Sequence, residues 1–465
     1  MRNTGSDDWI RPGSPGSDEV YNRAVNDARA TVRTNVRRIA ASVGGLRDDP
    51  RTPVLIAVAG GWFLSLGVRL VYPAVIPYLR TAYGISLSTA GLLLTVLWLA
   101  YAVGQLPGGV LSDRFGERAI LVTSTLVSGA VLGLVVVAGV VELLFAATAL
   151  FGLSTALYGV SRFTILSAVY PDNDGTAIGV TMAAGDLGNT LLPPFAGFLA
   201  VTFAWQFGFA FAIPGFLLAA IGLLVTLPAP NGGSGGDDAP AGDPAASSAN
   251  SAGSSADVSS AAASRALRRA VETGRTVADA LRSRPVIVVT AIQTLAYCAW
   301  QAFTGFYPTY LIEVKAIAPT TATLLFGGFF AMGVAVKPVT GRAYDMYGAR
   351  RTLPVVLAVA TASLAALPSV GSLPGLAVLT LGLSALLGYS TATLSYLTSA
   401  LPPAVRGSGL GVLRTGYMAI GAGSPVVAGT LADAGFFDEV FLLSSALALV
   451  AAGCCLLLPR EATEP

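Results

Sequence analysis

Five charged residues lie inside long apolar stretches of this chain: Arg69, Arg162, Asp186, Lys337 and Arg414. A charge in such a stretch is costly, so it indicates a functional site. Four cations against one carboxylate would make that site net positive, and a guanidinium presents planar, paired donors that fit a carboxylate or a phosphate. The sequence therefore predicts that Arg69, Arg162, Lys337 and Arg414 bind a small anion.

Asp186 is the one acid deep within an apolar stretch of the sequence, and the chain has no histidine. A proton relay through histidine is therefore excluded. We expect Asp186 to be the proton-coupling residue, with Asn189 about one helical turn further on as a binding candidate. Structural roles remain as alternatives: Arg162 could pair with Asp186, and Lys337 and Arg414 could extend to the nearer membrane surface.

Polar side chains also follow one face of a predicted helix. Gln293, Tyr297 and Gln301 are spaced by four residues, and Tyr158 and Arg162 share a face in the same way. Facing a central cavity, these side chains would form hydrogen bonds to a ligand. The alternative is that they form hydrogen bonds between neighbouring helices.

The elements that carry these residues are expected to cross a membrane. Of 465 residues, 54% are hydrophobic and 12% charged, and the mean hydropathy is +0.68; soluble domains carry about 25% charged residues. Most apolar stretches are long enough for a helix to span about 30 Å of hydrocarbon. They cover about 53–79, 87–110, 119–140, 143–169, 176–200, 204–228, 285–311, 318–341, 352–370, 374–399, 408–432 and 440–459. We expect an all-α integral membrane protein with twelve transmembrane helices.

The same composition excludes several classes of function. Without histidine, neither a His-dependent catalytic triad nor a His metal site can form. The three cysteines, Cys298, Cys454 and Cys455, lie in apolar stretches and are expected to pack between helices. The sequence also has no nucleotide-binding glycine loop. We expect a protein that is not an enzyme, needs no metal or cofactor, and binds no nucleic acid.

A charged loop occurs twice in the sequence, at an offset of 232 residues. The residues shared by the two copies are Gly109, Asp113, Gly116 and Arg118 in the first, and Gly341, Asp345, Gly348 and Arg350 in the second. Further glycines and prolines match at the same offset, among them Pro193 with Pro425. A repeat of this kind indicates two related halves.

The halves are separated and flanked by polar segments. We expect a polar tail at 1–52, six apolar spans at 53–228, a flexible linker with a basic amphipathic helix at 229–284, six spans at 285–459, and a short tail at 460–465. Arginine concentrates in the first tail, the linker and the two repeated loops. The positive-inside tendency then predicts that both termini and the linker are cytoplasmic. Frequent arginine and sparse lysine are typical of a GC-rich prokaryotic genome, so we expect the protein to lie in the cell membrane.

The first loop, Gly-x-Leu-x-Asp-Arg-x-Gly-x-Arg over 109–118, resembles the signature loop between helices two and three of the major facilitator superfamily. Glu117 replaces the basic residue usual there, and the second copy has Ala343 and Met346 in place of Leu and Arg. The resemblance extends over 53–459 and implies two pseudo-symmetric six-helix bundles that rock around a central site. It also implies a conformational latch made of Gly109, Asp113, Arg114, Gly116 and Arg118 with their counterparts Gly341, Asp345, Gly348 and Arg350.

Arg69 and Arg162 are also similar, by position and chemistry, to arginines that organic-anion and phosphate-ester branches of that family use on their substrates. The resemblance therefore implies a monomeric secondary transporter of an organic anion, of carboxylate type, coupled to protons. One alternative is efflux of amphipathic compounds by proton antiport. Another is a membrane protein of transporter type that senses or scaffolds and does not transport.

Overall fold

The computed structural model describes residues 49–227, 281–402 and 406–459, and every regular element in these ranges is a helix. This confirms the expected all-α class. The expected polar tail, the linker with its amphipathic helix and the C-terminal tail lie outside the described residues, apart from 49–52 and 281–284. Long apolar segments favour helices in a membrane because a helix satisfies its own backbone hydrogen bonds without water.

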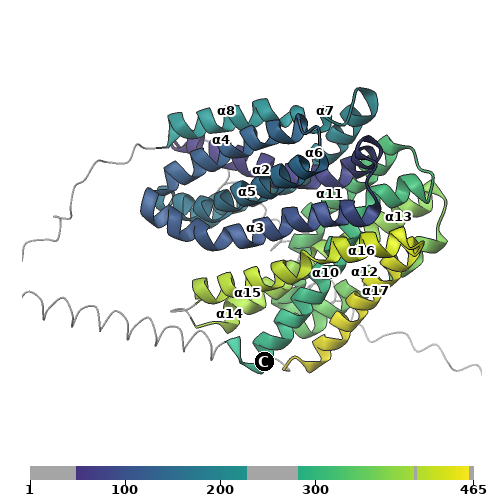
Figure 1. Ribbon diagram of the computed structural model, residues 1–465. Coiled ribbons are helices and arrows are strands. Elements are labelled where there is room, and N and C mark those ends of the chain that lie inside the picture. The colour runs from purple at the N-terminus through teal and green to yellow at the C-terminus, as the bar shows by residue number, and fades with distance from the viewer. Residues whose placement is uncertain (1–48, 228–280, 403–405, 460–465) are drawn as a thin grey trace, which may run out of the picture.

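The helices form two groups (Figure 1). The first comprises α2 (Thr52–Tyr83), α3 (Leu87–Phe115), α4 (Glu117–Val136), α5 (Val141–Val169), α6 (Asp174–Thr202), α7 (Phe207–Ala210) and α8 (Ala212–Thr226). The second comprises α10 (Arg284–Glu313), α11 (Pro319–Tyr347), α12 (Ala349–Ala366), η1 (Leu367–Ser369), α13 (Leu373–Leu383), η2 (Ser384–Leu387), α14 (Tyr389–Ala400), α15 (Arg406–Gly421), α16 (Ser424–Asp433), α17 (Phe437–Cys454) and η4 (Cys455–Leu457).

Ten stretches in the described ranges are long and apolar enough to cross a membrane. The remaining crossings are α6, whose hydropathy is lowered by polar residues such as Asp186 and Asn189, and the pair α15–α16, which Ala422 and Gly423 separate. Together they give the twelve expected spans. The chain is thus a multi-pass membrane protein.

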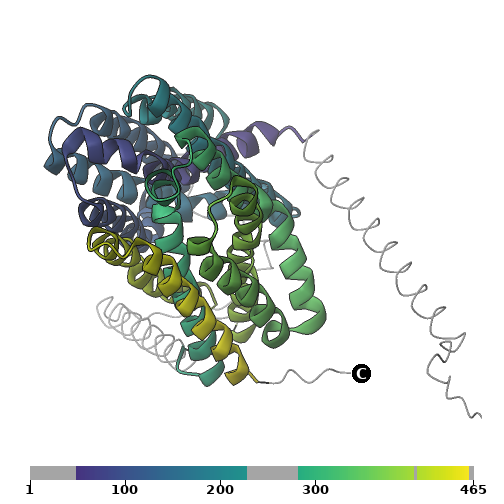
Figure 2. The same ribbon diagram turned by 90° about the vertical axis from the view of Figure 1, so that its right-hand side faces the viewer.

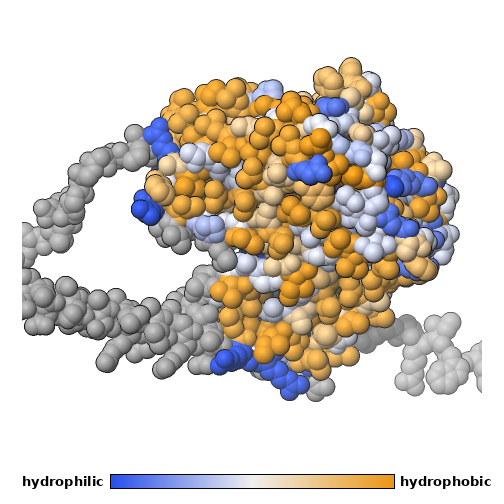
Figure 3. Space-filling view, viewed as in Figure 1, coloured by the Kyte–Doolittle hydropathy of each residue, from blue (hydrophilic) through white to orange (hydrophobic). Residues whose placement is uncertain are grey.

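The outer surface of the helices is apolar, as a lipid environment requires. Large hydrophobic side chains such as Val225 and Leu218 are 78% and 69% exposed. Figure 3 shows that apolar side chains cover most of the visible face and that hydrophilic residues lie mainly toward its ends. Such an extent of exposed apolar surface is unfavourable in water but suits hydrocarbon.

Helices pack on one another within each group, and extensive contacts also join the two groups (Figures 1 and 2). In the first group α2 packs along α6, and α5 packs along α3 and α4; in the second, α17 packs on α10 and α12. Between the groups, α6 packs along α11, and α3 packs along α15 and α16. These two lines of contact bound the space in which a central site can lie.

The repeated loops adopt the same local structure. Gly116 and Gly348 have φ values of 82° and 73°, a left-handed region that favours glycine. Their N–H groups donate to the carbonyl oxygens of Ser112 and Tyr344, both at 2.8 Å. The equivalent chemistry at a constant offset supports the duplication found in the sequence.

The arginines of the repeat fasten helices within their own group. Arg118 Nη2 donates to the Leu224 carbonyl at 2.8 Å, and Arg350 Nη1 donates to the Leu458 carbonyl at 2.7 Å. Asp345 is exposed and has no hydrogen bond or ion pair with another described residue. The Asp113 side chain lies outside the described part of the chain, so the expected latch stays a prediction.

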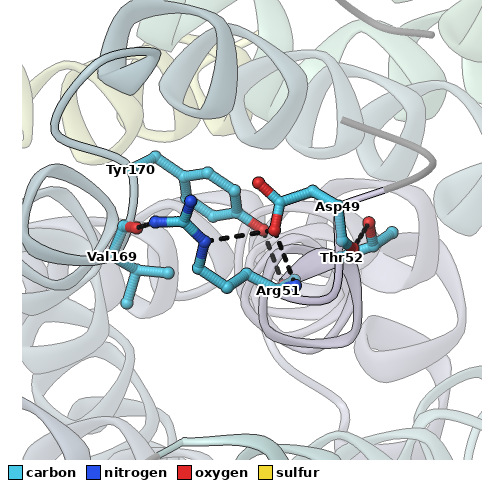
Figure 4. A network of polar contacts seen from close by, with 5 residues as sticks. All are labelled: Asp49, Arg51, Thr52, Val169 and Tyr170. Carbon is cyan, nitrogen blue, oxygen red and sulfur yellow. Dashed lines mark hydrogen bonds and ion pairs between the residues drawn. The ribbon is translucent and has the colours of Figure 1, made fainter. Parts of the chain in front are cut away.

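A polar network holds the start of α2 against the end of α5 (Figure 4). Arg51 Nη1 donates to the Val169 carbonyl at 2.6 Å, and the Tyr170 hydroxyl donates to the Arg51 carbonyl at 2.6 Å. The backbone N–H and the guanidinium of Arg51 hold the pKa of Asp49 below its ordinary value. This network belongs to the face at which α2 begins and η4 ends, which we call the terminal face.

At the opposite face, polar contacts close the two groups on each other. Arg80 at the end of α2 pairs with Glu313 at the end of α10, with 2.5 Å between Nη1 and Oε1. The Asp433 carboxylate accepts hydrogen bonds from the backbone N–H groups of Leu87 and Ser88 at 2.8 and 2.7 Å, and so caps the start of α3 from the other group.

Two glycines allow α3 and α16 to approach closely at this face. A Cβ atom at Gly429 would lie 2.2 Å from the Leu87 carbonyl oxygen, and one at Gly91 would lie 2.2 Å from the Pro425 carbonyl oxygen. Both obstructing atoms are backbone atoms, which cannot rotate away. The closed arrangement therefore depends on the absence of side chains at Gly91 and Gly429.

We expect Gly429→Ala to lower the melting temperature of the purified protein, because the methyl group must separate α3 from α16, at a cost of about 1–3 kcal/mol. Gly453→Ala is the matched control, since a Cβ atom at this helical glycine meets nothing within 4 Å. Thermal unfolding in detergent measures both. Equal melting temperatures for the two variants would contradict the close packing of α3 and α16.

Candidate functional site

A cluster of arginines and aromatic rings lies in the middle of the helices. Trp62 and Arg69 are both on α2, separated by seven residues, or about two helical turns. Arg69 is completely buried, and its guanidinium carbon lies 3.7 Å from the ring centroid of Tyr101 on α3. Its Nε donates to the Ser65 carbonyl at 2.9 Å. Nη1 and Nη2 have no hydrogen-bond partner among the residues that the structure describes.

Arg162 on α5 meets the same cluster from another side. Its guanidinium carbon lies 3.3 Å from the Trp62 ring centroid, and Nη2 contacts the sulfur of Met182 on α6 at 3.4 Å. Within the described ranges, the buried Nε and Nη1 atoms of Arg162 have no partner. Trp62 thus lies close to both Arg69 and Arg162.

Arg414 brings a third guanidinium, from the second group of helices. It lies on α15 beside Tyr101 and Tyr417, and its buried Nε has no partner in the described part of the chain. Tyr101 is close enough to interact electrostatically with Arg69, Arg162 and Arg414. The structure therefore brings three predicted binding residues together around one ring.

This cluster has the electrostatics of an anion site. Donor groups that are buried without a partner cost free energy, and a buried charge costs more. The faces of Trp62 and Tyr101 stabilise the guanidinium groups by cation–π attraction, but a ring face does not satisfy an N–H group. A carboxylate bound between the arginines would supply the missing acceptors.

The fourth predicted cation, Lys337 on α11, pairs with Asp186 on α6. Its Nζ donates to both carboxylate oxygens, at 2.6 Å and 2.7 Å, across the boundary between the two groups. Asp186 therefore pairs with Lys337 and not with Arg162, which was the structural alternative for these charges. Lys337 is also not extended to the membrane surface.

A cavity of about 740 Å³ lies between the two groups. Gln293, Lys337 and Tyr417 line it, together with Met182, whose sulfur contacts Arg162. The α14 side adds a set of hydroxyl groups: Ser390, Thr391, Ser395, Thr398 and Ser399. The cavity has the volume of a typical small-molecule site. It reaches Ser399 near the end of α14, toward the terminal face, while the opposite face is closed.

The polar residues predicted to share one face of α10 have different surroundings in the structure. Gln293 lines the cavity and accepts a hydrogen bond from Thr393. Tyr297 stacks on Trp300, with ring centroids 5.6 Å apart, and meets Tyr417 edge to face. Gln301 is 1% exposed, and neither its amide nitrogen nor its amide oxygen has a partner among the described residues.

The remaining candidates lie in the first group. The Tyr158 hydroxyl donates to the Val58 carbonyl at 2.7 Å, and its ring stacks on Trp62, so Tyr158 supports the ring that lies against Arg162. Asn189 is nearly buried, and its Oδ1 atom has no partner within the described ranges.

Sequence analysis did not single out the aromatic residues that hold the arginines. Trp62 could have been found from its spacing of seven residues before Arg69, which places both on one face of a helix. Tyr417 follows Arg414 by three residues, a spacing that also places both on one face of a helix. Tyr101 gives no such signal, because it meets the arginines only through packing between different helices.

Comparison with known proteins gives a family match over most of the chain. A family model described as Major Facilitator Superfamily matches residues 57–316 and 289–465. The probable galactarate/D-glucarate transporter GudP of Bacillus subtilis (strain 168) is 33% identical over 149 residues, which are 30% of this chain and 32% of that one. The hexuronate transporter of the same strain is 29% identical over 150 residues, 32% and 34% of the two chains. The matched region thus spans about a third of the length of these relatives.

Solved structures have the same fold at low sequence identity. A bacterial homologue of the human lysosomal transporter Spinster, in an inward-facing and unoccupied conformation, has a TM-score of 0.71 at 16% identity; 88% of this chain and 97% of that chain are covered. The D-xylose–proton symporter has a TM-score of 0.65 at 14% identity, with 89% and 98% covered.

We expect Gln301→Leu to raise the melting temperature of the ligand-free protein, since a buried amide without partners costs about 1–3 kcal/mol. Gln293→Leu is the comparison variant: it removes the acceptor of the Thr393 hydroxyl and should lower the melting temperature. Differential scanning fluorimetry measures both. A lower melting temperature for Gln301→Leu would show that this amide is satisfied in the protein.

Proposed function

This chain belongs to the Major Facilitator Superfamily, whose members are transporters and not enzymes, and we propose that its cargo is a small organic anion of carboxylate type. The observation that carries the proposal is the convergence of Arg69, Arg162 and Arg414 around Tyr101. Arg69 and Arg162 are buried and Arg414 is half-buried, and several of their donors have no acceptor in the described part of the chain.

A carboxylate would bind between these guanidinium groups. Arg69 offers Nη1 and Nη2, and Arg162 offers Nε and Nη1; either pair matches the two oxygens of a carboxylate. Trp62 and Tyr101 exclude water from the arginines, which strengthens each charge-assisted hydrogen bond. Arg414 adds a contact from the second group, so that one anion would engage both groups at once.

The names of two relatives support this class of cargo. GudP is named for galactarate and D-glucarate, and another relative for hexuronate. These compounds are sugar acids that carry several hydroxyl groups besides their carboxylates. The hydroxyl-rich α14 side of the cavity, with Ser390, Thr391 and Ser395, suits hydrogen bonding to such a chain.

Alternating access would move the anion from one face to the other. The contacts of Asp433 with α3 and of Arg80 with Glu313 close one face, while the cavity extends toward the terminal face. With the termini cytoplasmic, as the arginine distribution favours, this is the inward-open state. The return step separates α3 from α16 and closes the terminal face, where the repeated loops act as the latch.

We propose that Asp186 is the proton-coupling residue. We also propose that the protein lies in the cell membrane as a monomer. Asp186 faces the boundary between the two groups, where its partner Lys337 lines the cavity. A proton on Asp186 would weaken the pair with Lys337 and so connect protonation with movement of α6 relative to α11. Asn189, three residues further along α6, is the neighbouring binding candidate.

The second candidate function is efflux of amphipathic compounds. It is favoured by the aromatic side chains around the site, above all Tyr297, Trp300 and Tyr417, which form a continuous set of ring contacts. A lipophilic cation would depend on Asp186 and would be repelled by the arginines, so the two candidates differ in their charge requirements.

We expect Arg162→Gln to reduce uptake of galactarate or a hexuronate into proteoliposomes by about tenfold or more, the effect of losing one charge-assisted hydrogen bond. Arg351→Gln is the matched control: it removes one exposed arginine at the start of α12 and should leave uptake unchanged. Unchanged uptake in Arg162→Gln, or transport of lipophilic cations in its place, would overturn the anion proposal.

A further inference from the structure

Lys337 is a cationic group of the cavity that is separate from the arginine cluster. It lies on α11, in the second group of helices, and its side chain is 31% exposed to the space between the groups. An ammonium group has three N–H donors, and two hydrogen bonds from Nζ go to the oxygens of Asp186. The remaining donor and the exposed surface of Lys337 are open to a ligand in the cavity.

The position of Lys337 relative to the arginine cluster follows from α6. Met182 contacts Arg162, and Asp186 contacts Lys337, so that one helix touches both cationic groups. Met182 and Asp186 are four residues apart on α6, a rise of about 6 Å. The contacts that α6 makes with Arg162 and with Lys337 are therefore separated by about one helical turn, and Met182, at the arginine end of this turn, also lines the cavity. A chain of about four to six carbons, with roughly 1.5 Å per bond, spans that length.

The group that now binds Lys337 is itself a carboxylate. Asp186 presents both oxygens to Nζ, which is how a carboxylate of a ligand would also bind. In the described part of the chain, Asp186 has no second cationic partner. The Asp186 carboxylate thus occupies the position beside Lys337 that a second acidic group of a ligand would take.

We propose that Lys337 binds the second carboxylate of a dicarboxylate cargo, and that Asp186 holds this place in the empty protein. The first carboxylate binds to Arg69, Arg162 and Arg414, as in the proposed function, on which this inference rests. The second carboxylate displaces Asp186 from Lys337. A monocarboxylate engages only the arginine cluster and leaves the Asp186–Lys337 pair intact, so Lys337 is the residue that selects for two acidic groups.

The exchange also alters how the two groups are joined. The ion pair fastens α6 to α11, whereas a dicarboxylate connects α2, α5 and α15 with α11. A ligand with a carboxylate at both ends would therefore replace the Asp186–Lys337 ion pair with its own contact to Lys337. A ligand with one charged end would not.

The test compares two open-chain sugar acids of equal length, galactarate with two carboxylates and galactonate with one. Their dissociation constants are measured by calorimetry on the purified full-length protein. We expect the wild type to bind galactarate about tenfold to a hundredfold more tightly, and Lys337→Gln to bring the two acids within about threefold. Asp186→Asn frees Lys337 and should tighten galactarate binding by a larger factor than galactonate binding.

Lys315→Gln is the matched control, because Lys315 is the other lysine of the chain and donates to the Pro368 carbonyl, outside the cavity. It should change neither constant. If Lys337→Gln does not fold, the double variant Asp186→Asn/Lys337→Gln keeps an uncharged pair of similar shape. The preference for galactarate should be lost in it as well.

The outcomes separate this inference from the proposed function. If Lys337→Gln weakens the binding of both acids equally, the ion pair has a structural role only. The same conclusion follows if this variant still binds galactarate more tightly than galactonate. In both cases the inference fails, while Arg162→Gln still weakens both acids if the anion function is correct. If the wild type binds neither acid, or Arg162→Gln has no effect, the proposed function and the inference fail together.

Discussion

The guanidinium groups of Arg69, Arg162 and Arg414, the first two buried and the third half-buried, lie close to one another around Tyr101, with no carboxylate paired to them among the residues that the structure describes. Like charges repel, and in a medium of low dielectric constant that repulsion is strong. The aromatic faces of Trp62 and Tyr101 compensate for part of the cost, because each lies within 4 Å of a guanidinium carbon. The rest of the structure follows from the need to keep these charges near one another and away from lipid.

The two faces of the protein differ in the contacts that connect the two groups of helices. At the opposite face, Gly91 and Gly429 bring α3 and α16 into backbone contact, and Asp433 caps α3 across the boundary. At the terminal face, Arg118 and Arg350 donate hydrogen bonds to carbonyl groups of their own helix group. Polar contacts between the groups therefore close the opposite face, while the cavity between the groups extends toward the terminal face.

Much of this arrangement could be predicted from the sequence, because it follows from local patterns. Apolar stretches gave the membrane spans, the offset of 232 residues predicted that Gly116 and Gly348 are equivalent, and charges within apolar stretches identified the arginines. The contacts between charged or aromatic residues that are distant in the sequence could not be predicted. Asp186 and Lys337 are 151 residues apart, and their contact depends on how α6 and α11 pack. The same holds for Tyr101, which neighbours arginines from three helices.

The positive charge of the site has an electrical consequence. With Asp186 neutralising Lys337, the described site of the empty protein retains the charges of Arg69, Arg162 and Arg414. Moving one elementary charge through a membrane potential changes the free energy by about 2.3 kcal/mol per 100 mV. A bound anion cancels part of that charge, so the loaded and the empty protein respond to voltage to different extents. The membrane potential then acts mainly on the reorientation of the empty carrier, and a cell interior that is negative holds the unloaded site on its own side.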